Sequence, residues 1–215
     1  MEKLAHNIAE TIAINLHYDD DKKAVIAYGL AAIFQMASIF VITSIIGLLC
    51  GFWMESMVVF LAVGFLRKST GGAHSKTFQG CMIISIFSIA LLSFLARYIL
   101  DINNIREKLF VIIAVTVAYF FSFIMVYELA PVDSPEKPIV RKEKIALLRR
   151  KSFVTLGLYG CIALSLIFLS KNNPRFISIS ISFCFATLWQ VFTLTKTGIH
   201  LIHKIDSKFI IHTKI

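Results

Sequence analysis

The sequence has 215 residues, of which 57% are hydrophobic and 16% are charged. Soluble globular proteins average about 45–50% apolar and about 25% charged residues, so this composition excludes an ordinary soluble domain, and the chain is also too apolar to be disordered. The formal net charge of +9 would suggest nucleic-acid binding in a soluble protein, but basic cytoplasmic loops explain it in a membrane protein. We therefore predict an integral membrane protein that binds no nucleic acid.

Six apolar segments follow one another along the chain. A membrane-spanning helix needs about 20 mostly apolar residues. Segments of this kind lie at about 24–46, 50–66, 78–100, 109–130, 152–170 and 176–195. The first two are expected to form a hairpin that turns at residues 47–51, and the short second segment could instead be re-entrant. We predict an all-α integral membrane protein with about six transmembrane helices, in which residues 1–215 form a single polytopic domain.

Both ends of the chain predict amphipathic helices instead of spans. In residues 1–23, apolar residues recur at helical spacing between Leu4 and Leu16. In residues 196–215, an apolar side that includes Ile202 lies opposite histidines and lysines. Helices of this kind lie along a membrane surface, so we expect interfacial helices on either side of a transmembrane bundle at residues 24–195. The acidic residues near the N-terminus argue against a signal peptide.

The basic residues orient the predicted helices. If the N-terminus is cytoplasmic, 17 of the 22 lysines and arginines fall in cytoplasmic segments and five fall on the outer side. Cytoplasmic loops of membrane proteins carry an excess of Lys and Arg. We therefore expect a multi-pass protein whose two termini lie in the cytoplasm, together with the loops that precede the third and fifth apolar segments.

Residues 67–81 contain a candidate catalytic segment. Gly71 and Gly72 allow a sharp turn or a close approach of the backbone to a ligand, His74 follows at once, and Cys81 comes at the predicted start of a helix. The positive end of a helix favours a thiolate, and a nearby imidazole could act as its general base. The segment could therefore supply a nucleophile for acyl transfer, or it could be a capping loop with an incidental thiol.

A metal site is the weaker interpretation of this segment. One histidine and one cysteine provide two ligands, whereas a catalytic zinc needs three from the protein. The other five histidines lie in the terminal segments. We expect neither a metal ion nor another cofactor.

A proline-rich and strongly basic region follows the fourth apolar segment. Three of the four prolines fall in residues 131–138, where they end the helix and stiffen the loop. The basic residues of this region are Lys137, Arg141, Lys142, Lys144, Arg149, Arg150 and Lys151. They could simply orient the protein and contact anionic lipids, at about 1 kcal/mol each. They could also form a landing site for an acidic peptide.

Charged residues inside the apolar segments are few. Glu55 and Arg97 lie near the outer ends of the second and third segments, where they could pair or extend toward water. Glu128 lies near the inner end of the fourth segment, at the depth of His74. It could orient His74 as a third catalytic member, although we favour the alternative that it offsets the basic pair at residues 67–68.

The two loop regions together resemble the accessory gene regulator protein B (AgrB) family, the membrane peptidases that mature bacterial autoinducing peptides. Arg67, the run Gly71-Gly72-Ala73-His74 and Cys81 are similar to that family's arginine, glycine–glycine–x–histidine and cysteine pattern. Ala130-Pro131 and Lys137-Pro138 are similar to its proline–lysine loop. Chain length, basic charge and multiple spans also agree, so the resemblance covers nearly the whole chain.

The resemblance implies a cysteine endopeptidase, a thiol protease in which Cys81 is the nucleophile and His74 its base. Backbone N–H groups at the start of the third apolar segment, together with the turn at Gly71 and Gly72, are candidate oxyanion donors, and Arg67 supports this loop. The third catalytic residue is not part of the family pattern. The basic residues between Lys137 and Lys151 would hold the acidic tail of a substrate.

The resemblance also implies a partner and a location. The partner would be an AgrD-type precursor peptide of quorum sensing, and the protein would lie in the bacterial cell membrane. The enzyme would remove the peptide's acidic C-terminal tail, hold the remainder as a thioester, and pass it to the peptide's own cysteine, which closes a thiolactone. In some relatives a serine closes a lactone instead. A homodimer is implied as well, and Gly157 and Gly160 would permit close contact between helices.

Two other classes of function are compatible with the sequence. A peptide transporter or exporter would use His74 and Cys81 only structurally, but transporters usually carry paired repeats and midplane helix breaks, and neither is clear here. A non-catalytic membrane scaffold would present its basic loop to a partner.

The predicted orientation can be tested by cysteine labelling. In a chain whose four native cysteines are replaced by alanine, a single cysteine at position 103 should react with a membrane-impermeant maleimide added outside intact cells. A cysteine at position 68 should react only after the cells are permeabilised. The reverse pattern would invert the topology.

Overall fold

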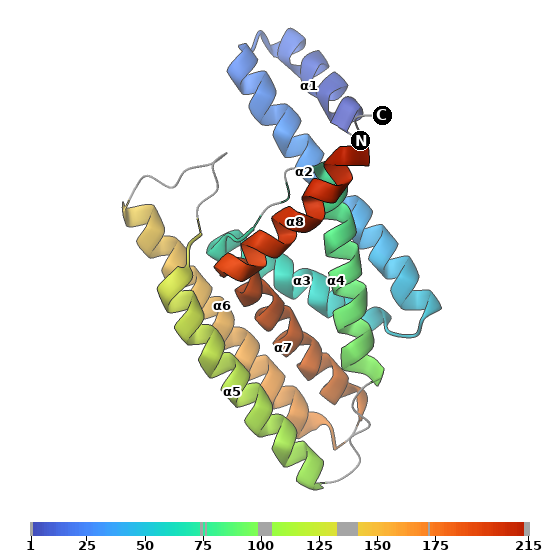
Figure 1. Ribbon diagram of the computed structural model, residues 1–215, viewed down its shortest axis with the longest axis vertical. Helices are drawn as coiled ribbons and strands as arrows, with labels where there is room; N and C mark the ends of the chain where they lie inside the picture. The colour runs from blue at the N-terminus through green and yellow to red at the C-terminus, as the bar shows by residue number, and fades with distance from the viewer. Residues whose placement is uncertain are drawn as a thin grey trace.

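The computed structural model describes residues 2–73, 75, 77–98, 105–132, 142–171 and 173–212. The regular structure of these residues is helical, and their one β-type contact is an isolated bridge between Gly71 and Val132. The helices are α1 (Glu2–Leu16), α2 (Asp20–Leu49), α3 (Trp53–Thr70), α4 (Phe78–Tyr98), α5 (Ile105–Leu129), α6 (Lys142–Leu169), α7 (Arg175–Leu194) and α8 (Lys196–His212). The prediction of an all-α fold is confirmed (Figure 1).

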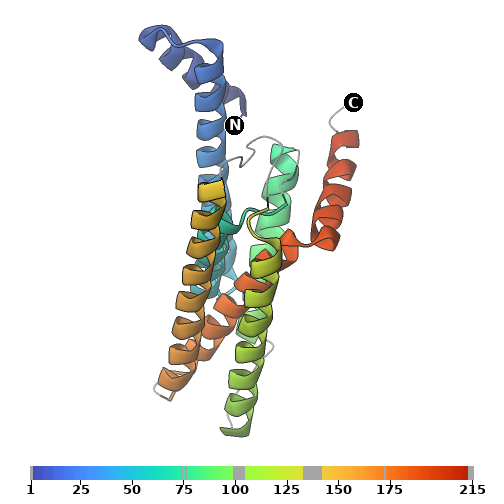
Figure 2. The same cartoon turned by 90° about the vertical axis from the view of Figure 1, so that its left-hand side faces the viewer.

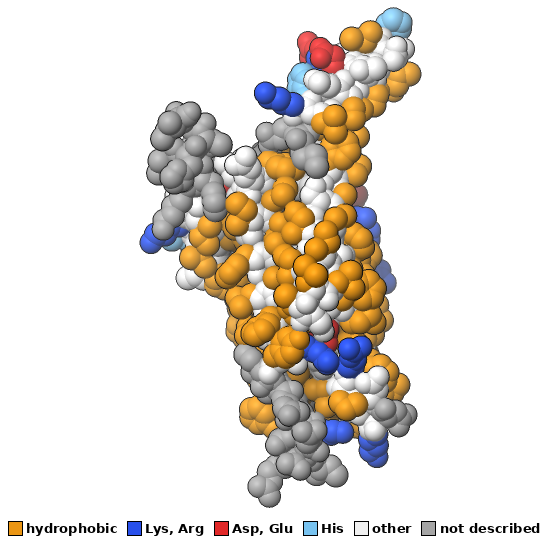
Figure 3. All heavy atoms as spheres, turned by 90° about the vertical axis from the view of Figure 1, so that its right-hand side faces the viewer, with side chains coloured by type: hydrophobic (Ala, Val, Ile, Leu, Met, Phe, Trp, Pro, Cys, Tyr) orange, Lys and Arg blue, Asp and Glu red, His pale blue; other side chains and the backbone are white. Residues whose placement is uncertain are grey.

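Five of these helices are long and apolar enough to cross a membrane, namely α2, α4, α5 from Lys108 onward, α6 and α7. Helix α3 lies among them in the bundle but is shorter than most and carries Glu55, Arg67 and Lys68. Figure 3 shows hydrophobic side chains over the middle of one face of the molecule and a group of basic side chains near its lower end. The described part of the chain is therefore a multi-pass membrane protein, as predicted. It has five candidate spans where about six were predicted, because α3, which corresponds to the second predicted segment, is not one of them.

The first two predicted spans form a helical hairpin. Asp19 caps the start of α2 by accepting a hydrogen bond from the backbone N–H of Lys22 at 2.9 Å. The turn between α2 and α3 comprises residues 50–52, and Gly47 lets the two helices approach closely, because a Cβ there would lie 2.8 Å from the Cα of Trp53. The hairpin prediction is confirmed, and α3 runs back along α2 into the bundle.

Helix α7 is the centre of the bundle. It contacts α3, α4, α5, α6 and α8, and 67% of its span is buried, against 28% or less in the other four spans. Its buried face carries many small polar residues, among them Ser178, Ser180, Ser182, Thr187 and Thr193. Small residues let helices approach closely in a membrane, and hydroxyls can bond backbone groups of a neighbour. Ser180 does so by donating to the Ala163 carbonyl of α6 at 2.7 Å.

Each terminal helix packs through one face, as an amphipathic pattern predicts, but in α1 the buried residues are alanines, and Leu4 and Leu16 of the predicted apolar face are exposed. Helix α1 folds back on α2, where Ala5, Ala9 and Ala13 are buried, and this pair projects from one end of the molecule (Figure 2). Helix α8 contacts α7 and α4, with Ile202 buried and His203 exposed. Both helices are amphipathic as expected.

An intramembrane ion pair lies at the end of the bundle where α3 and α7 begin. Glu55 is 3% exposed and lies in the first turn of α3, where the helix dipole favours a carboxylate. Its Oε1 accepts a hydrogen bond from Ser178 at 2.6 Å and lies 4.0 Å from Nη1 of Arg97. The sequence left open whether Glu55 and Arg97 pair or extend toward water, and the structure shows that they pair.

Replacing Arg97 by methionine should lower the free energy of unfolding by about 1–3 kcal/mol, because the buried Glu55 carboxylate loses its cation. Thermal unfolding in detergent micelles measures this change. Arg175→Met is the matched control, since Arg175 is an exposed arginine at the same end of the bundle. Equal effects of the two substitutions would remove the stabilising role of the pair.

Candidate functional site

The two loop motifs found in the sequence lie side by side. Helix α3 ends at Thr70, and Gly71 then adopts φ +71°, a region that favours glycine. Gly71 forms a parallel bridge with Val132, whose N–H donates to the Thr70 carbonyl at 2.9 Å. A side chain on Gly71 would collide with the Val132 carbonyl oxygen. The glycine pair is thus joined to the segment that begins Ala130-Pro131, a contact that the sequence analysis did not predict.

Helix α7 holds the other side of this loop. The fully buried Gln190 donates from Nε2 to the Gly71 carbonyl at 2.7 Å and to Thr70 Oγ1 at 2.9 Å. The Ala73 N–H donates to the Thr193 carbonyl at 3.0 Å. Gly72 adopts φ +128°, and a Cβ there would lie 2.8 Å from Thr193 Oγ1. In the sequence, Gln190 is a single amide within an apolar segment, and this signal could have identified it as a functional residue.

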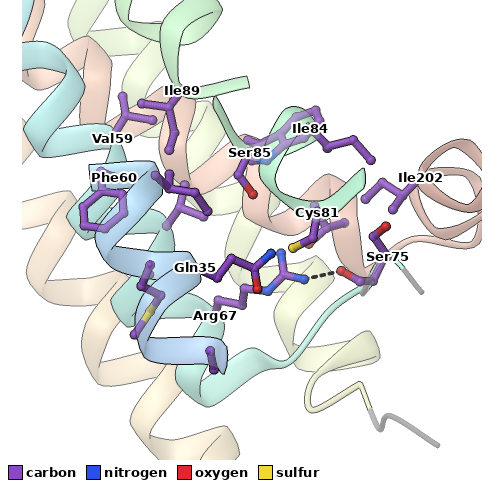
Figure 4. Close-up of a pocket in the computed structure, with 18 of the residues that line it drawn as sticks. Gln35, Val59, Phe60, Arg67, Ser75, Cys81, Ile84, Ser85, Ile89 and Ile202 are labelled. Atoms are coloured by element: carbon purple, nitrogen blue, oxygen red, sulfur yellow. Dashed lines mark hydrogen bonds between the residues drawn. The ribbon is translucent and has the colours of Figure 1, made fainter. Parts of the chain in front are cut away.

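Cys81 and Arg67 line one cavity at this end of the bundle. Cys81 lies in the first turn of α4, where its N–H donates to the Thr77 carbonyl at 3.1 Å. Arg67 lies in the last turn of α3 and donates from Nη2 to the Ala73 carbonyl. Figure 4 shows the Arg67 guanidinium and the Cys81 thiol pointing toward the same space, beside Gln35. No described carboxylate forms an ion pair with Arg67.

The cavity itself is mostly apolar. It has a volume of about 270 Å³ and lies between α2, α3, α4 and α7. Its apolar lining includes Val59, Phe60, Ile84 and Ile89 (Figure 4). A thiol and a guanidinium on the wall of a mostly apolar cavity are suited to chemistry that needs a nucleophile, a positive charge and little water.

Several predicted site residues lie outside the described residues, namely His74, Lys137 and Arg141. The distance between His74 and Cys81 therefore stays a prediction. Among the described residues, no group of three or more His, Cys, Asp or Glu side chains could hold a metal ion.

The described basic residues of α6 separate into two kinds. Arg149 donates from Nε to the Ala130 carbonyl at 3.1 Å and lies over the Tyr127 ring at 5.7 Å, so it holds the end of α5 in place. Arg150 and Lys151 are exposed, and together with Lys68 they line a pocket of about 460 Å³ between α3 and α6.

Lys142 and Glu128 lie apart from this pocket. Lys142 is exposed at the start of α6, and Glu128 is exposed near the end of α5. Glu128 makes no ion pair with a described residue.

Sequence reasoning missed Asp206 of α8. This carboxylate is 1% exposed, and its Oδ1 accepts a hydrogen bond from Ser75 Oγ at 2.5 Å and another from the Thr77 hydroxyl. Asp206 therefore contacts the candidate catalytic segment from the far end of the chain. The sequence did contain one indication of this burial: Asp206 comes four residues after Ile202, which puts it on the apolar side of the predicted helix.

The fold and the site define a multi-pass membrane protein with a thiol-containing cavity at one end of its helical bundle. Residues 3–194 match the model of the family Accessory gene regulator B. This match covers most of the chain, so the chain belongs to the AgrB family. Family membership gives the protein a role in agr quorum-sensing peptide processing, in association with the membrane and the AgrD precursor.

Relatives in other bacteria support the same family. A Clostridium perfringens protein named as AgrB-like is 30% identical over 209 residues, which cover 96% of this chain and 97% of the relative. An AgrB-like protein of Clostridium acetobutylicum is 25% identical over 84% of this chain and 81% of its own length. One from Listeria innocua is 26% identical over 73% of this chain and 74% of its own. No solved structure matches the chain.

Replacing Gly72 by alanine should destabilise the site loop by roughly 1–3 kcal/mol, because alanine is strained at this positive φ and its Cβ would contact Thr193. Thermal unfolding in detergent micelles measures the loss. The control is Gly29→Ala in α2, where no atom lies within 4 Å of the added Cβ. A Gly72→Ala protein as stable as the control would show that the loop adapts without strain.

Proposed function

We propose that this protein is a membrane-embedded cysteine endopeptidase that cuts the acidic C-terminal tail from an AgrD-type precursor. The observation that carries the proposal is the placement of Cys81 and Arg67 on one cavity, beside the loop whose chain contains His74. The family role in peptide processing supplies the substrate. The reaction is peptide-bond cleavage through a thioester, followed by ring closure.

The first half of the proposed reaction forms the acyl-enzyme. His74 accepts the proton of the Cys81 thiol, and the sulfur attacks the carbonyl carbon of the scissile amide. The tetrahedral intermediate then collapses: the C–N bond breaks, and the departing amine of the tail takes the proton from the imidazole. The remaining peptide stays bound to Cys81 as a thioester.

The second half closes the ring. In this proposal the His74 imidazole accepts the proton of the precursor's internal cysteine, whose sulfur attacks the acyl carbon. The bond between the acyl carbon and the Cys81 sulfur breaks, and the departing Cys81 thiolate takes the proton back from His74. The product is a thiolactone, or a lactone where a serine hydroxyl attacks. Exchange of one thioester for another has little drive, so departure of the cleaved tail pulls the reaction forward. The apolar lining around the thiol supports this step by limiting hydrolysis.

Arg67 is the proposed electrostatic partner of the nucleophile. Its guanidinium is held on the Ala73 carbonyl and shares the cavity with Cys81. A fixed positive charge favours the thiolate and also the oxyanion of the tetrahedral intermediate. The N–H groups of Gly80 and Cys81 already donate to Thr77, and the Gly71 N–H donates to the Arg67 carbonyl at 2.9 Å. The Gly72 N–H and the first N–H groups of α4 therefore stay candidate donors to the same oxyanion.

The pocket lined by Lys68, Arg150 and Lys151 is the proposed landing site for the acidic tail. Lys68, which lines this pocket, directly follows Arg67, which lines the cavity, at the same end of α3. Arg149 is better assigned to structure, because it holds the Ala130 carbonyl. Lys137, Arg141 and Lys142 stay proposed contributors.

We further propose that the site lies on the cytoplasmic side, together with both termini, and that the protein acts as a homodimer. The orientation rests on the distribution of basic residues. The dimer rests on the resemblance alone, because Gly157 and Gly160 contact Phe123 and Tyr119 of α5 within the same chain. Residues 1–215 act as one polytopic domain in this proposal.

Mass spectrometry of a co-reconstituted AgrD-type precursor tests the proposed nucleophile. The unaltered protein should release the acidic tail and trap the remaining fragment as a thioester that hydroxylamine removes. Cys81→Ala should do neither, whereas Cys161→Ala, which removes an exposed cysteine that does not line the cavity, should behave as the unaltered protein does. Equal processing by the Cys81→Ala protein would overturn the proposal and favour a transporter or a scaffold.

Replacing Lys68, Arg150 and Lys151 together by glutamate should raise KM for an acidic-tailed precursor at least tenfold, because like charges then face the tail. The triple replacement of Lys108, Lys171 and Arg175 by glutamate is the matched control, since it changes the net charge equally at the other end of the bundle. A precursor with a neutralised tail should show little difference between the two proteins. An unchanged KM for the acidic tail would exclude this landing site.

A further inference from the structure

We infer that Asp206 of α8 is a positioning residue of the reaction, which holds the segment before α4 so that Cys81 presents its thiol to the cavity. This inference rests on the proposed function. It assigns to the C-terminal helix a part in the site, although the residues that match the family end at 194.

The burial of Asp206 is the first observation. Carboxylates are almost never fully buried unless they have partners, and Asp206 is 1% exposed. Its neighbours in sequence differ from it, since Lys204 and Ser207 are exposed on the same helix. The side chain is thus on the face of α8 that meets the bundle, beside Ile202.

The second observation is what the carboxylate contacts. Oδ1 accepts hydrogen bonds from Ser75 and Thr77, which lie 131 and 129 residues away in the sequence. Hydrogen bonds to a charged acceptor are stronger than neutral ones. Gly80 makes this approach possible, because any side chain there would collide with the Asp206 carboxylate.

The third observation links these contacts to the nucleophile. Thr77 Oγ1 accepts from the Gly80 N–H at 3.0 Å, and the Thr77 carbonyl accepts from the Cys81 N–H at 3.1 Å. Ser75 lines the same cavity as Cys81 (Figure 4). Asp206 therefore fixes both Ser75 and Thr77, the residue that directly precedes the helix of the nucleophile.

The segment between Gly72 and α4 is consequently held at two points. Thr193 at the end of α7 binds the backbone of Ala73, and Asp206 binds the side chains of Ser75 and Thr77. The chain position of His74 lies between these two anchors. Release of the second anchor should leave the bundle folded but let the start of α4 and its thiol move.

Kinetic analysis of four variants tests this role: Asp206→Ala, Asp206→Asn, Ser75→Ala, and Asp206→Ala combined with Ser75→Ala. We expect Asp206→Ala to lower kcat for precursor cleavage at least 30-fold with KM changed less than threefold. Asp206→Asn should recover to within fivefold of the unaltered protein, because its amide oxygen still accepts from the hydroxyls. Ser207→Ala, on the exposed side of α8, is the control and should leave both constants unchanged.

The double variant separates positioning from general damage. Ser75→Ala alone should lower kcat about fivefold, and adding it to Asp206→Ala should cause no further loss, because the two residues act through one contact. A kcat of Asp206→Ala within threefold of the unaltered protein, or losses that multiply in the double variant, would overturn the inference.

A readout that needs no substrate distinguishes this inference from the proposed function. In a chain that keeps Cys81 and carries alanine at the other three cysteines, iodoacetamide should alkylate Cys81 at least fivefold faster in Asp206→Ala than in Ser207→Ala. Unaltered protein that cuts no precursor would contradict the proposed function, whereas equal alkylation rates would contradict the positioning role.

Discussion

The constraint on which the structure depends is the need to satisfy non-helical backbone inside an apolar bundle. Thr70, Gly72 and Ala73 are buried, and buried backbone groups need hydrogen-bond partners, so polar groups of the protein must supply them. The turn after α3 leaves helical geometry at Gly71 and Gly72, and its carbonyl and N–H groups are bonded by Gln190, by Thr193 and by the strand-like contact with Val132. Helix α7 is accordingly the most buried span and among the most polar in its core.

Charge is distributed between two layers at opposite ends of this bundle. At one end the Glu55 carboxylate meets Arg97 and Ser178. At the other end Arg67 is held by the Ala73 carbonyl, and Asp206 binds the hydroxyls that precede α4. The helices between these two layers are apolar, which suits contact with lipid. The end that contains Arg67 combines the Cys81 thiol with fixed charges. A site with this composition is suited to acyl transfer, which requires both a reactive sulfur and protection from water.

The family role and the geometry complement one another. Membership in the AgrB family connects the chain with agr peptide processing and the AgrD precursor, and the cavity beside Cys81 offers a physical account of how a peptide could be processed there. The basic pocket between α3 and α6 adds a place for an acidic segment. The same account separates Arg149, which supports the backbone at Ala130, from Arg150 and Lys151, which are exposed.

The sequence by itself determined the helices, the hairpin of α2 and α3 and the composition of the reactive segment, because hydropathy, helical periodicity and glycine content are local properties of the chain. It also placed Glu55 and Arg97 at one depth. Only the tertiary structure decided that Gly71 forms a bridge with Val132 and that Gln190 holds the loop. It also decided that Gly157 faces α5 and that Asp206 accepts a hydrogen bond from Ser75. These contacts join residues far apart in the chain, and a single polar residue in an apolar pattern does not indicate its partner until the helices are packed.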